Sequence, residues 1–201
     1  IFTCAVFVNC GIQMKRSIPT LQRVLLRHEL LGSPDGKIVV FLHGLLGNKN
    51  NLRTLAKRIQ KEHKHISPLL LDLRGHGQSP SREKGSSDAI TLNCCAQDVI
   101  GTVQELGFRG ETKSPAGIIG HSFGGRVALE YAKTLSLLQE ETPGSFNKVY
   151  QPNMTWILDS VPGTAHGSVD KVISALSSMP QPIESKQYLM DHLCQKGIDP
   201  S

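Results

Sequence analysis

The chain has 201 residues, of which 39% are hydrophobic and 19% are charged, and its formal net charge is +5. This length suits one α/β domain with a sizeable core and is too short for two. The basic residues are spread along the sequence, without the clusters and interleaved aromatic residues that nucleic-acid binding favours. Composition therefore predicts a single domain with no nucleic-acid partner.

The N-terminal region carries a weak targeting signal. Its opening stretch, IFTCAVFVNC, is apolar but far shorter than the roughly 20 residues of a transmembrane helix. Between Met14 and His28 there are basic residues and no acidic one, which is typical of a transit peptide and also of a solvated basic stretch. We therefore assign residues 1–24 to a leader or disordered segment and predict no transmembrane segment.

The cysteines bear on metal binding and on the cellular compartment. Their spacing matches no metal site, and two of them lie in a helical pattern where we expect buried apolar side chains. The five cysteines are Cys4, Cys10, Cys94, Cys95 and Cys194. We expect no metal, no cofactor and a reduced intracellular location, with cytoplasm and organelle (mitochondrion or plastid) both left open.

Two strand and helix pairs follow the N-terminal region. KIVVFLH (37–43) is a short apolar run between turn signals, which predicts a buried strand. The next segment has apolar residues at helical spacing, with Asn50 or Asn51 placed to cap its first turn. SPLLLDLRGHG (67–77) predicts a second strand. The apolar faces of the two predicted helices carry Leu52, Leu55, Ala56 and Ile59, and Ala96, Val99, Ile100, Val103 and Leu106.

The alternation continues to residue 163 and then stops. Residues 115–120 predict a third strand, followed by a helix with Val127, Tyr131 and Leu135 on one face, and TWILDSVPG (155–163) predicts a fourth buried strand. Alternating strands and helices imply a parallel sheet covered on both faces. SVDKVISALSSM and ESKQYLMDHLCQKG then predict two consecutive helices. We assign 25–165 to the core and 166–201 to the start of a helical cap.

A serine occupies the turn between the third strand and its helix. Gly120-His121-Ser122-Phe123-Gly124 matches the G-x-S-x-G nucleophile elbow in the strand-to-helix context that the motif requires. In such a turn the serine backbone is strained, and flanking side chains would collide with the neighbouring elements. Gly120 and Gly124 relieve that crowding, and Gly125 lets the helix approach closely. The alternative is a glycine-rich turn of structural use alone.

A nucleophilic Ser122 would also need hydrogen-bond donors for the tetrahedral oxyanion that its attack creates. One predicted donor is the backbone N–H of Phe123, the residue after the nucleophile. The other is the backbone N–H of Leu45 in the loop HGLLG (43–47), which follows the first strand. His43 and Gly44 precede that donor. We expect His43 to have a structural role, or to orient the loop by a hydrogen bond, rather than to act as the general base.

Three segments together resemble a known family. FLHGLLGNKNN, LDLRGHGQS and GHSFGG, in this order, are similar to the α/β-hydrolase superfamily, and most to the branch of α/β-hydrolase domain-containing protein 11 and its bacterial esterase relatives. The resemblance implies an α/β-hydrolase fold with a helical cap and a serine hydrolase acting on a small-molecule ester or thioester. Residues matching the family loop D-x-R-x-H-G-x-S are expected to brace it: Asp72, Arg74, His76 and Ser79.

The rest of the family's catalytic triad is harder to place. The family order is Ser, then an acid, then His, with the last two after later strands. His166 and His192 follow no such strand and are expected to be surface or cap residues, so the resemblance implies a C-terminally truncated fragment without the triad histidine. Asp159, at the end of the fourth predicted strand, either orients that histidine or hydrogen-bonds the following Pro-Gly turn.

Other functions stay open at this stage. A non-catalytic scaffold or small-molecule binding protein would keep the sheet and lack the base. An acyltransferase would share the acyl-enzyme and differ only in the acceptor, so the sequence does not separate it from a hydrolase. The sequence makes no prediction of the oligomeric state.

Overall fold

The computed structural model describes residues 23–81, 91–141, 149–160, 171, 174–180 and 184–198. The chain divides into two compact units, Ile1–Val161 and Pro162–Ser201. Residues 1–22 of the predicted leader lie outside the described residues. Val24, near the end of that predicted segment, is buried in the first unit. The assignments of a leader and of a cap stay predictions.

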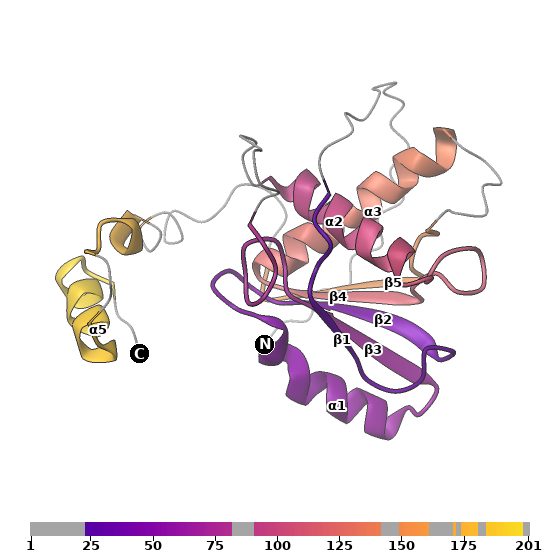
Figure 1. Cartoon of the computed structure of the whole chain (residues 1–201), viewed down its shortest axis with the longest axis horizontal. Coiled ribbons are helices and arrows are strands. Elements are labelled where there is room, and N and C mark those ends of the chain that lie inside the picture. Colours follow the sequence, from indigo (N-terminus) through magenta and orange to yellow (C-terminus); the bar gives the residue numbers. More distant parts are fainter. Residues whose placement is uncertain are drawn as a thin grey trace. The chain divides into compact units, whose positions relative to one another are not determined.

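The first unit is built on a five-stranded sheet in the order β1-β3-β2-β4-β5 (Figure 1). β1 pairs with β3 in the antiparallel sense, and the other neighbours are parallel. The parallel sheet predicted from the alternating pattern is therefore confirmed, with one short antiparallel strand added. The strands are β1 (His28–Leu30), β2 (Lys37–Leu42), β3 (Ile66–Leu71), β4 (Gly117–His121) and β5 (Met154–Leu158).

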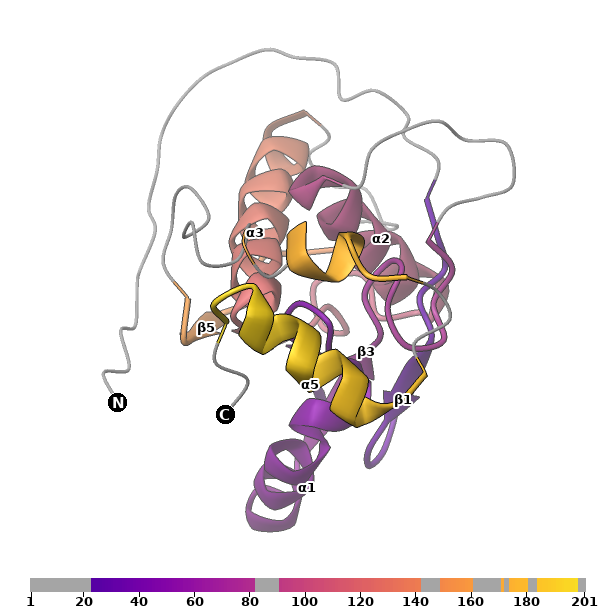
Figure 2. The ribbon, with the colours of Figure 1, turned by 90° about the vertical axis from the view of Figure 1, so that its left-hand side faces the viewer.

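Helices cover both faces of this sheet. α2 (Leu92–Glu105) and α3 (Phe123–Glu141) lie side by side on one face, and α1 (Arg53–Glu62) lies on the other (Figures 1 and 2). Successive strand residues point to opposite faces, so the continuous apolar run of β2 supplies both layers. Val40 and Leu42 belong to the cluster that includes α2 and α3 residues, and Val39 and Phe41 belong to the cluster of Ala56 in α1.

The start of α1 differs from the prediction. A single 3-10 turn, η1 (Lys49–Leu52), precedes the helix, and Asn48 caps that turn by accepting a hydrogen bond from the Asn50 N–H at 3.0 Å. The Asn51 side chain accepts in return from the Asn48 N–H at 2.7 Å. α1 itself begins after Leu52 without a side-chain cap. The predicted cap at Asn50 or Asn51 was therefore wrong by two or three positions. The 3-10 turn starts the helical segment at Lys49, so the capping residue is Asn48.

The segment before β1 is held against α2 by backbone donors. The Val24 N–H donates to Asp98 Oδ1 at 2.7 Å, and the Leu26 N–H donates to Thr102 Oγ1 at 3.0 Å. These two backbone N–H groups are therefore satisfied by side-chain acceptors on α2. These hydrogen bonds fasten the segment before β1 to α2.

The second unit contains α5 (Lys186–Gln195) and helical residues at 174–177. Ser185 caps α5 by accepting from the Tyr188 N–H at 3.0 Å. His192 lies within this unit, with its Nε2 3.2 Å from the Ala175 carbonyl oxygen. The predicted helix of residues 184–197 is thus present, and His166 lies outside the described residues.

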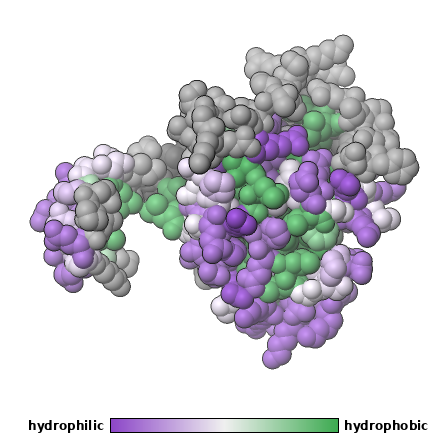
Figure 3. Space-filling model, viewed as in Figure 1, coloured by the Kyte–Doolittle hydropathy of each residue, from purple (hydrophilic) through white to green (hydrophobic). Residues whose placement is uncertain are grey.

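Hydrophobic side chains interrupt the hydrophilic surface of the first unit (Figure 3). The large exposed ones are Leu25, Leu46, Leu55, Met154 and Trp156. Within the part of the chain that the structure describes, every helix is too short or too polar to cross a bilayer. Cys94 and Cys95 are buried as expected, and Cys194 is exposed on α5.

Candidate active site

Ser122 is the single residue between β4 and α3. Its φ of 51° lies in the left-handed region, which a residue with a Cβ seldom adopts. Two backbone hydrogen bonds hold it there: the Ser122 N–H donates to the Leu158 carbonyl and the Gly125 N–H donates to the Ser122 carbonyl, both at 2.9 Å. The turn therefore projects Ser122 at the carboxyl edge of the sheet, where parallel sheets bind ligands.

The glycines around Ser122 allow three elements to meet. A Cβ at Gly120 would collide with the backbone of Gly124, and one at Gly124 would collide with the backbone of Leu42 in β2. A Cβ at Gly125 would lie 2.9 Å from Ile157 Cγ2 in β5. Each of these three positions therefore requires glycine, because a neighbouring strand or helix lies too close to leave room for a Cβ.

The loop after β2 lies against this turn. A Cβ at Gly44 would be 3.2 Å from Ser122 Cβ and 3.0 Å from His121 Nδ1. The Gly47 N–H donates to the Gly44 carbonyl at 3.1 Å, which closes a tight turn over the two leucines. The structure thus brings the loop of Leu45 to the elbow of Phe123. Their roles as oxyanion donors stay predictions.

Leu46 has an unusual conformation in that turn. Its φ is 60°, and its exposed fraction is 65%. A β-turn with a positive φ at its third residue normally has glycine or asparagine there. Both the backbone conformation and the exposure are unfavourable for a leucine, which marks this loop as strained.

His43 is buried and uses both ring nitrogens. Its Nδ1–H donates to the Gly44 carbonyl at 2.8 Å, and its Nε2 accepts from the Leu73 N–H at 3.0 Å. These two bonds require the neutral ring with its proton on Nδ1. Burial lowers the pKa of His43 below its ordinary value, and the charge of nearby His76 acts in the same direction. The ring is therefore an orienting group with no nitrogen left to act as a base.

Asp72 ties the loop after β3 to the loop after β2. Its carboxylate accepts from the Lys49 N–H at 2.7 Å, from Lys49 Nζ at 2.8 Å and from the Gln78 N–H at 3.0 Å. Burial by itself would raise the pKa of Asp72, but these hydrogen bonds hold the pKa below its ordinary value. Gly77, with φ 54°, is needed because a Cβ there would meet the carboxylate.

Arg74 and Ser79 fasten the same loop on its other side. Arg74 forms a bidentate pair with Asp98 in α2. Ser79 Oγ donates to the Asp72 carbonyl at 2.7 Å and accepts from the Arg27 N–H at 2.9 Å. Sequence reasoning missed Asp98, although a lone aspartate among the apolar residues of α2 was a signal that a buried partner exists.

Asp159 follows β5 at the same edge of the sheet. It also has a positive φ, 49°, and its side chain is 91% exposed. The Asp159 carboxylate lies 4.0 Å from His121 Nε2. The Pro-Gly turn that Asp159 was expected to contact as an alternative lies outside the described residues.

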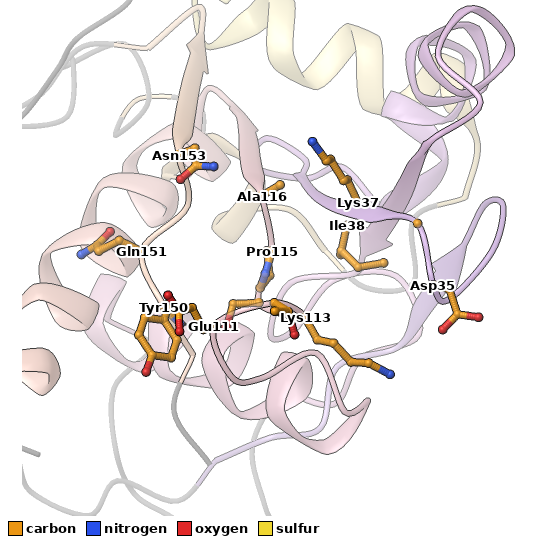
Figure 4. A pocket seen from close by; sticks show the side chains of 13 residues that line it. Asp35, Lys37, Ile38, Glu111, Lys113, Pro115, Ala116, Tyr150, Gln151 and Asn153 are labelled. Carbon is orange, nitrogen blue, oxygen red and sulfur yellow. Dashed lines mark hydrogen bonds between the residues drawn. The ribbon is translucent and has the colours of Figure 1, made fainter. Parts of the chain in front are cut away.

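A cavity of about 240 Å³ lies at the opposite edge, where β2, β4 and β5 begin. Figure 4 shows that its charged side chains do not converge: Lys37 and Lys113 extend in different directions. This hollow contains none of the predicted site residues. Among the described residues, no group of three or more His, Cys, Asp or Glu could hold a metal ion.

Comparisons with known proteins agree with this arrangement. A model of the alpha/beta hydrolase family matches residues 39–191. The chain is 30% identical over 174 residues to the sn-1-specific diacylglycerol lipase ABHD11 of Mus musculus, covering 79% of this chain and 52% of that protein. It is 32% identical over 118 residues to the ABHD11 lipase of Danio rerio, covering 58% of this chain and 33% of that protein.

A solved structure shows the same fold. A marine microorganism esterase superposes with a TM-score of 0.62 at 23% identity, covering 86% of this chain and 59% of the esterase. At this identity the likeness concerns the fold. The chain spans about half the length of the mouse relative.

Proposed function

Because this chain belongs to the α/β-hydrolase family, we propose that it carries the nucleophile of a serine hydrolase that cleaves carboxylic esters or thioesters through an acyl-enzyme on Ser122. The observation that carries the proposal is the left-handed Ser122 between β4 and α3. A backbone strained in this way persists only where the surrounding structure holds it, and such strain is concentrated at functional sites.

In this proposal Ser122 Oγ attacks the acyl carbon as a base removes its proton. The tetrahedral oxyanion accepts hydrogen bonds from the backbone N–H groups of Leu45 and Phe123. The alcohol or thiol leaves with a proton from the base, and water then releases the acid by the same route. The closeness of Gly44 to Ser122 supports the assignment of Leu45, since it places that loop beside the nucleophile.

In this proposal the general base is a histidine that follows a later strand, as in the family order of Ser, acid and His, and is neither His166 nor His192. Among the histidines that the structure describes, none is hydrogen-bonded to the Ser122 hydroxyl, and His43 is committed to Gly44 and Leu73. Asp159 is proposed to orient that histidine. Its carboxylate is 91% exposed at the carboxyl edge of the sheet, where an imidazole N–H can reach it, and its strained backbone supports a functional role.

The ester class of substrate is supported by the relatives. The mouse and zebrafish proteins are diacylglycerol lipases by name, and diacylglycerols are carboxylic esters. An acyltransferase would form the same acyl-enzyme. It would differ from a hydrolase only in passing the acyl group to an alcohol or amine instead of water. A scaffold without catalysis is the alternative that the following experiment tests.

The test is covalent labelling, with a fluorophosphonate probe, of a form of the protein that matches its relatives over their whole length (the full-length form). We expect labelling of the parent and of Ser160→Ala, and none of Ser122→Ala. Ser160 is a matched control because its Cβ lies near Gly125 at the same edge of the sheet. Labelling of Ser122→Ala would assign the chemistry to another residue. A parent that folds and takes no label would favour the scaffold.

A further inference from the structure

We propose that His76 is a positioning residue whose ring joins the two halves of the candidate oxyanion hole. The two predicted donors come from separate places in the chain: Leu45 from the loop after β2 and Phe123 from the start of α3. An oxyanion hole works only when its donors are held in place before the charge develops. The inference rests on the proposed function of Ser122, and it names the group that holds those donors together.

The ring of His76 lies beside both halves. Its centroid is 5.2 Å from that of His43, with the rings tilted by 55°, and 6.3 Å from that of Phe123, with the rings stacked at 26°. Ring pairs at these separations attract each other beyond the area that they bury. The three rings therefore form one continuous contact from the loop after β2 to the elbow.

The contact with His43 bears directly on the first donor. His43 holds the Gly44 carbonyl oxygen through a hydrogen bond of 2.8 Å. The Gly44 carbonyl and the Leu45 N–H belong to one planar trans peptide, so they point in opposite directions. A group that fixes the direction of the carbonyl thereby fixes the direction of the Leu45 N–H. The His43 ring, together with the Gly47 N–H that donates to the same carbonyl, therefore sets the direction of the Leu45 N–H.

The contact with Phe123 bears on the second donor. The side chain and the N–H of Phe123 are attached to the same Cα, at the first residue of α3. A ring stacked on His76 limits the rotation of this residue at a helix terminus, where no intrahelical hydrogen bond restrains the N–H. The His76 ring thus restrains the residues of both donors.

His76 itself is held firmly. Its Nδ1–H donates to the Arg74 carbonyl at 2.9 Å, and its backbone N–H donates to the Leu73 carbonyl at 2.9 Å. The loop on either side is fastened by the Arg74 pair with Asp98 and by the Asp72 bonds to Gln78 and Lys49. The ring therefore stands on a rigid support rather than on a mobile loop.

The test separates a ring contact from acid–base chemistry. His76→Phe keeps a planar ring and cannot exchange a proton, whereas His76→Ala removes the ring. In the 201-residue chain we expect His76→Ala to shift or broaden the backbone amide resonances of Leu45 and Phe123, and His76→Phe to leave both near the parent. The control His65→Ala, which removes one ring of the exposed His63–His65 pair, should leave both amides unchanged.

A second measurement uses the full-length form. Removing an oxyanion donor outright costs about 10²- to 10³-fold in kcat, so we expect His76→Ala to lower kcat about tenfold with little change in KM. His76→Phe should recover most of that loss. Equal losses in both variants, or unchanged amides and kcat in His76→Ala, would overturn the proposal. If Ser122 takes no label in the parent, the proposed function fails, while the amide resonances still decide whether His76 joins the two loops.

Discussion

The guanidinium of Arg74 is paired with the carboxylate of Asp98 where both side chains are almost fully removed from water. The Nε–Oδ2 distance is 2.6 Å and the Nη2–Oδ1 distance is 2.8 Å, with the two side chains 5% and 0% exposed. Asp98 also accepts the Val24 N–H at 2.7 Å. One carboxylate therefore holds together the loop after β3, helix α2 and the segment before β1.

Asp98→Asn should be strongly destabilising, because it removes the negative charge that pairs with the buried guanidinium of Arg74. We expect the free energy of unfolding to fall by about 3–5 kcal/mol, measured by urea denaturation. The control Glu62→Gln breaks the exposed pair with Arg58 and should cost less than about 1 kcal/mol. Similar losses in the two variants would show that the buried pair contributes no more than a surface pair.

Replacing Leu46 by glycine should stabilise the protein. The left-handed backbone costs a residue with a Cβ about 1–2 kcal/mol. Glycine removes that cost, but part of the gain is offset because glycine raises the conformational entropy of the unfolded chain. We expect the free energy of unfolding to rise by up to about 1 kcal/mol. The control Leu55→Gly lies in helix α1 and should lose about 1 kcal/mol. A loss in Leu46→Gly as well would mean that the leucine side chain makes a stabilising contact.

Two glycines of the same strand should respond differently to alanine. A Cβ at Gly120 meets the backbone of α3, which cannot move away without shifting the elbow, whereas a Cβ at Gly117 makes only ordinary contacts, the nearest at 3.5 Å from Met154 Cε. Gly120→Ala should lower the free energy of unfolding by about 3 kcal/mol or prevent folding. Gly117→Ala should fold like the parent. Thermal denaturation distinguishes the two, and a parent-like melting temperature for Gly120→Ala would contradict the close approach.

The neutral His43 makes stability depend on pH. Its pKa in the folded protein is lowered below the ordinary value of 6.5, mainly by burial, so the unfolded chain binds the proton more readily. The contribution of His43 is therefore complete above pH 6.5 and is lost as the pH falls from there through the lower folded pKa. Urea denaturation at pH 7.5 and 5.5 should show a smaller decrease for His43→Gln than for the parent. Equal decreases would contradict a buried neutral ring.

Asp159→Asn tests the proposed triad acid in the full-length form. If the carboxylate orients the histidine, kcat should fall by about 10⁴-fold, as when the acid of a serine protease triad is replaced by its amide. The melting temperature should hardly change, because the side chain is 91% exposed. Turnover close to that of the parent would reduce Asp159 to a turn residue.

Much of the fold followed from the periodicity of apolar residues. β2, β3 and β4 each contain a short apolar stretch (IVVFL, LLL and II) because both faces of the sheet are covered, and the helices after them show the 3.6-residue spacing of a buried stripe. β1 was not predicted. Its three residues are too few to show a period, and only its pairing with β3 makes it a strand. The prediction that the fourth strand is buried was wrong: β5 is the edge strand of the described sheet, and its Met154 and Trp156 are exposed.

The candidate site divides in the same way. The elbow could be located because its motif is contiguous, so that Gly120, Ser122 and Gly124 are neighbours before any folding takes place. The pairing of Arg74 with Asp98 and the stack of His43, His76 and Phe123 join residues far apart in the chain. Local pattern can indicate that a buried partner exists, but it does not identify that partner. The stack exists because the order β3-β2-β4 places the ends of three parallel strands side by side, and that order is decided by packing of the whole sheet.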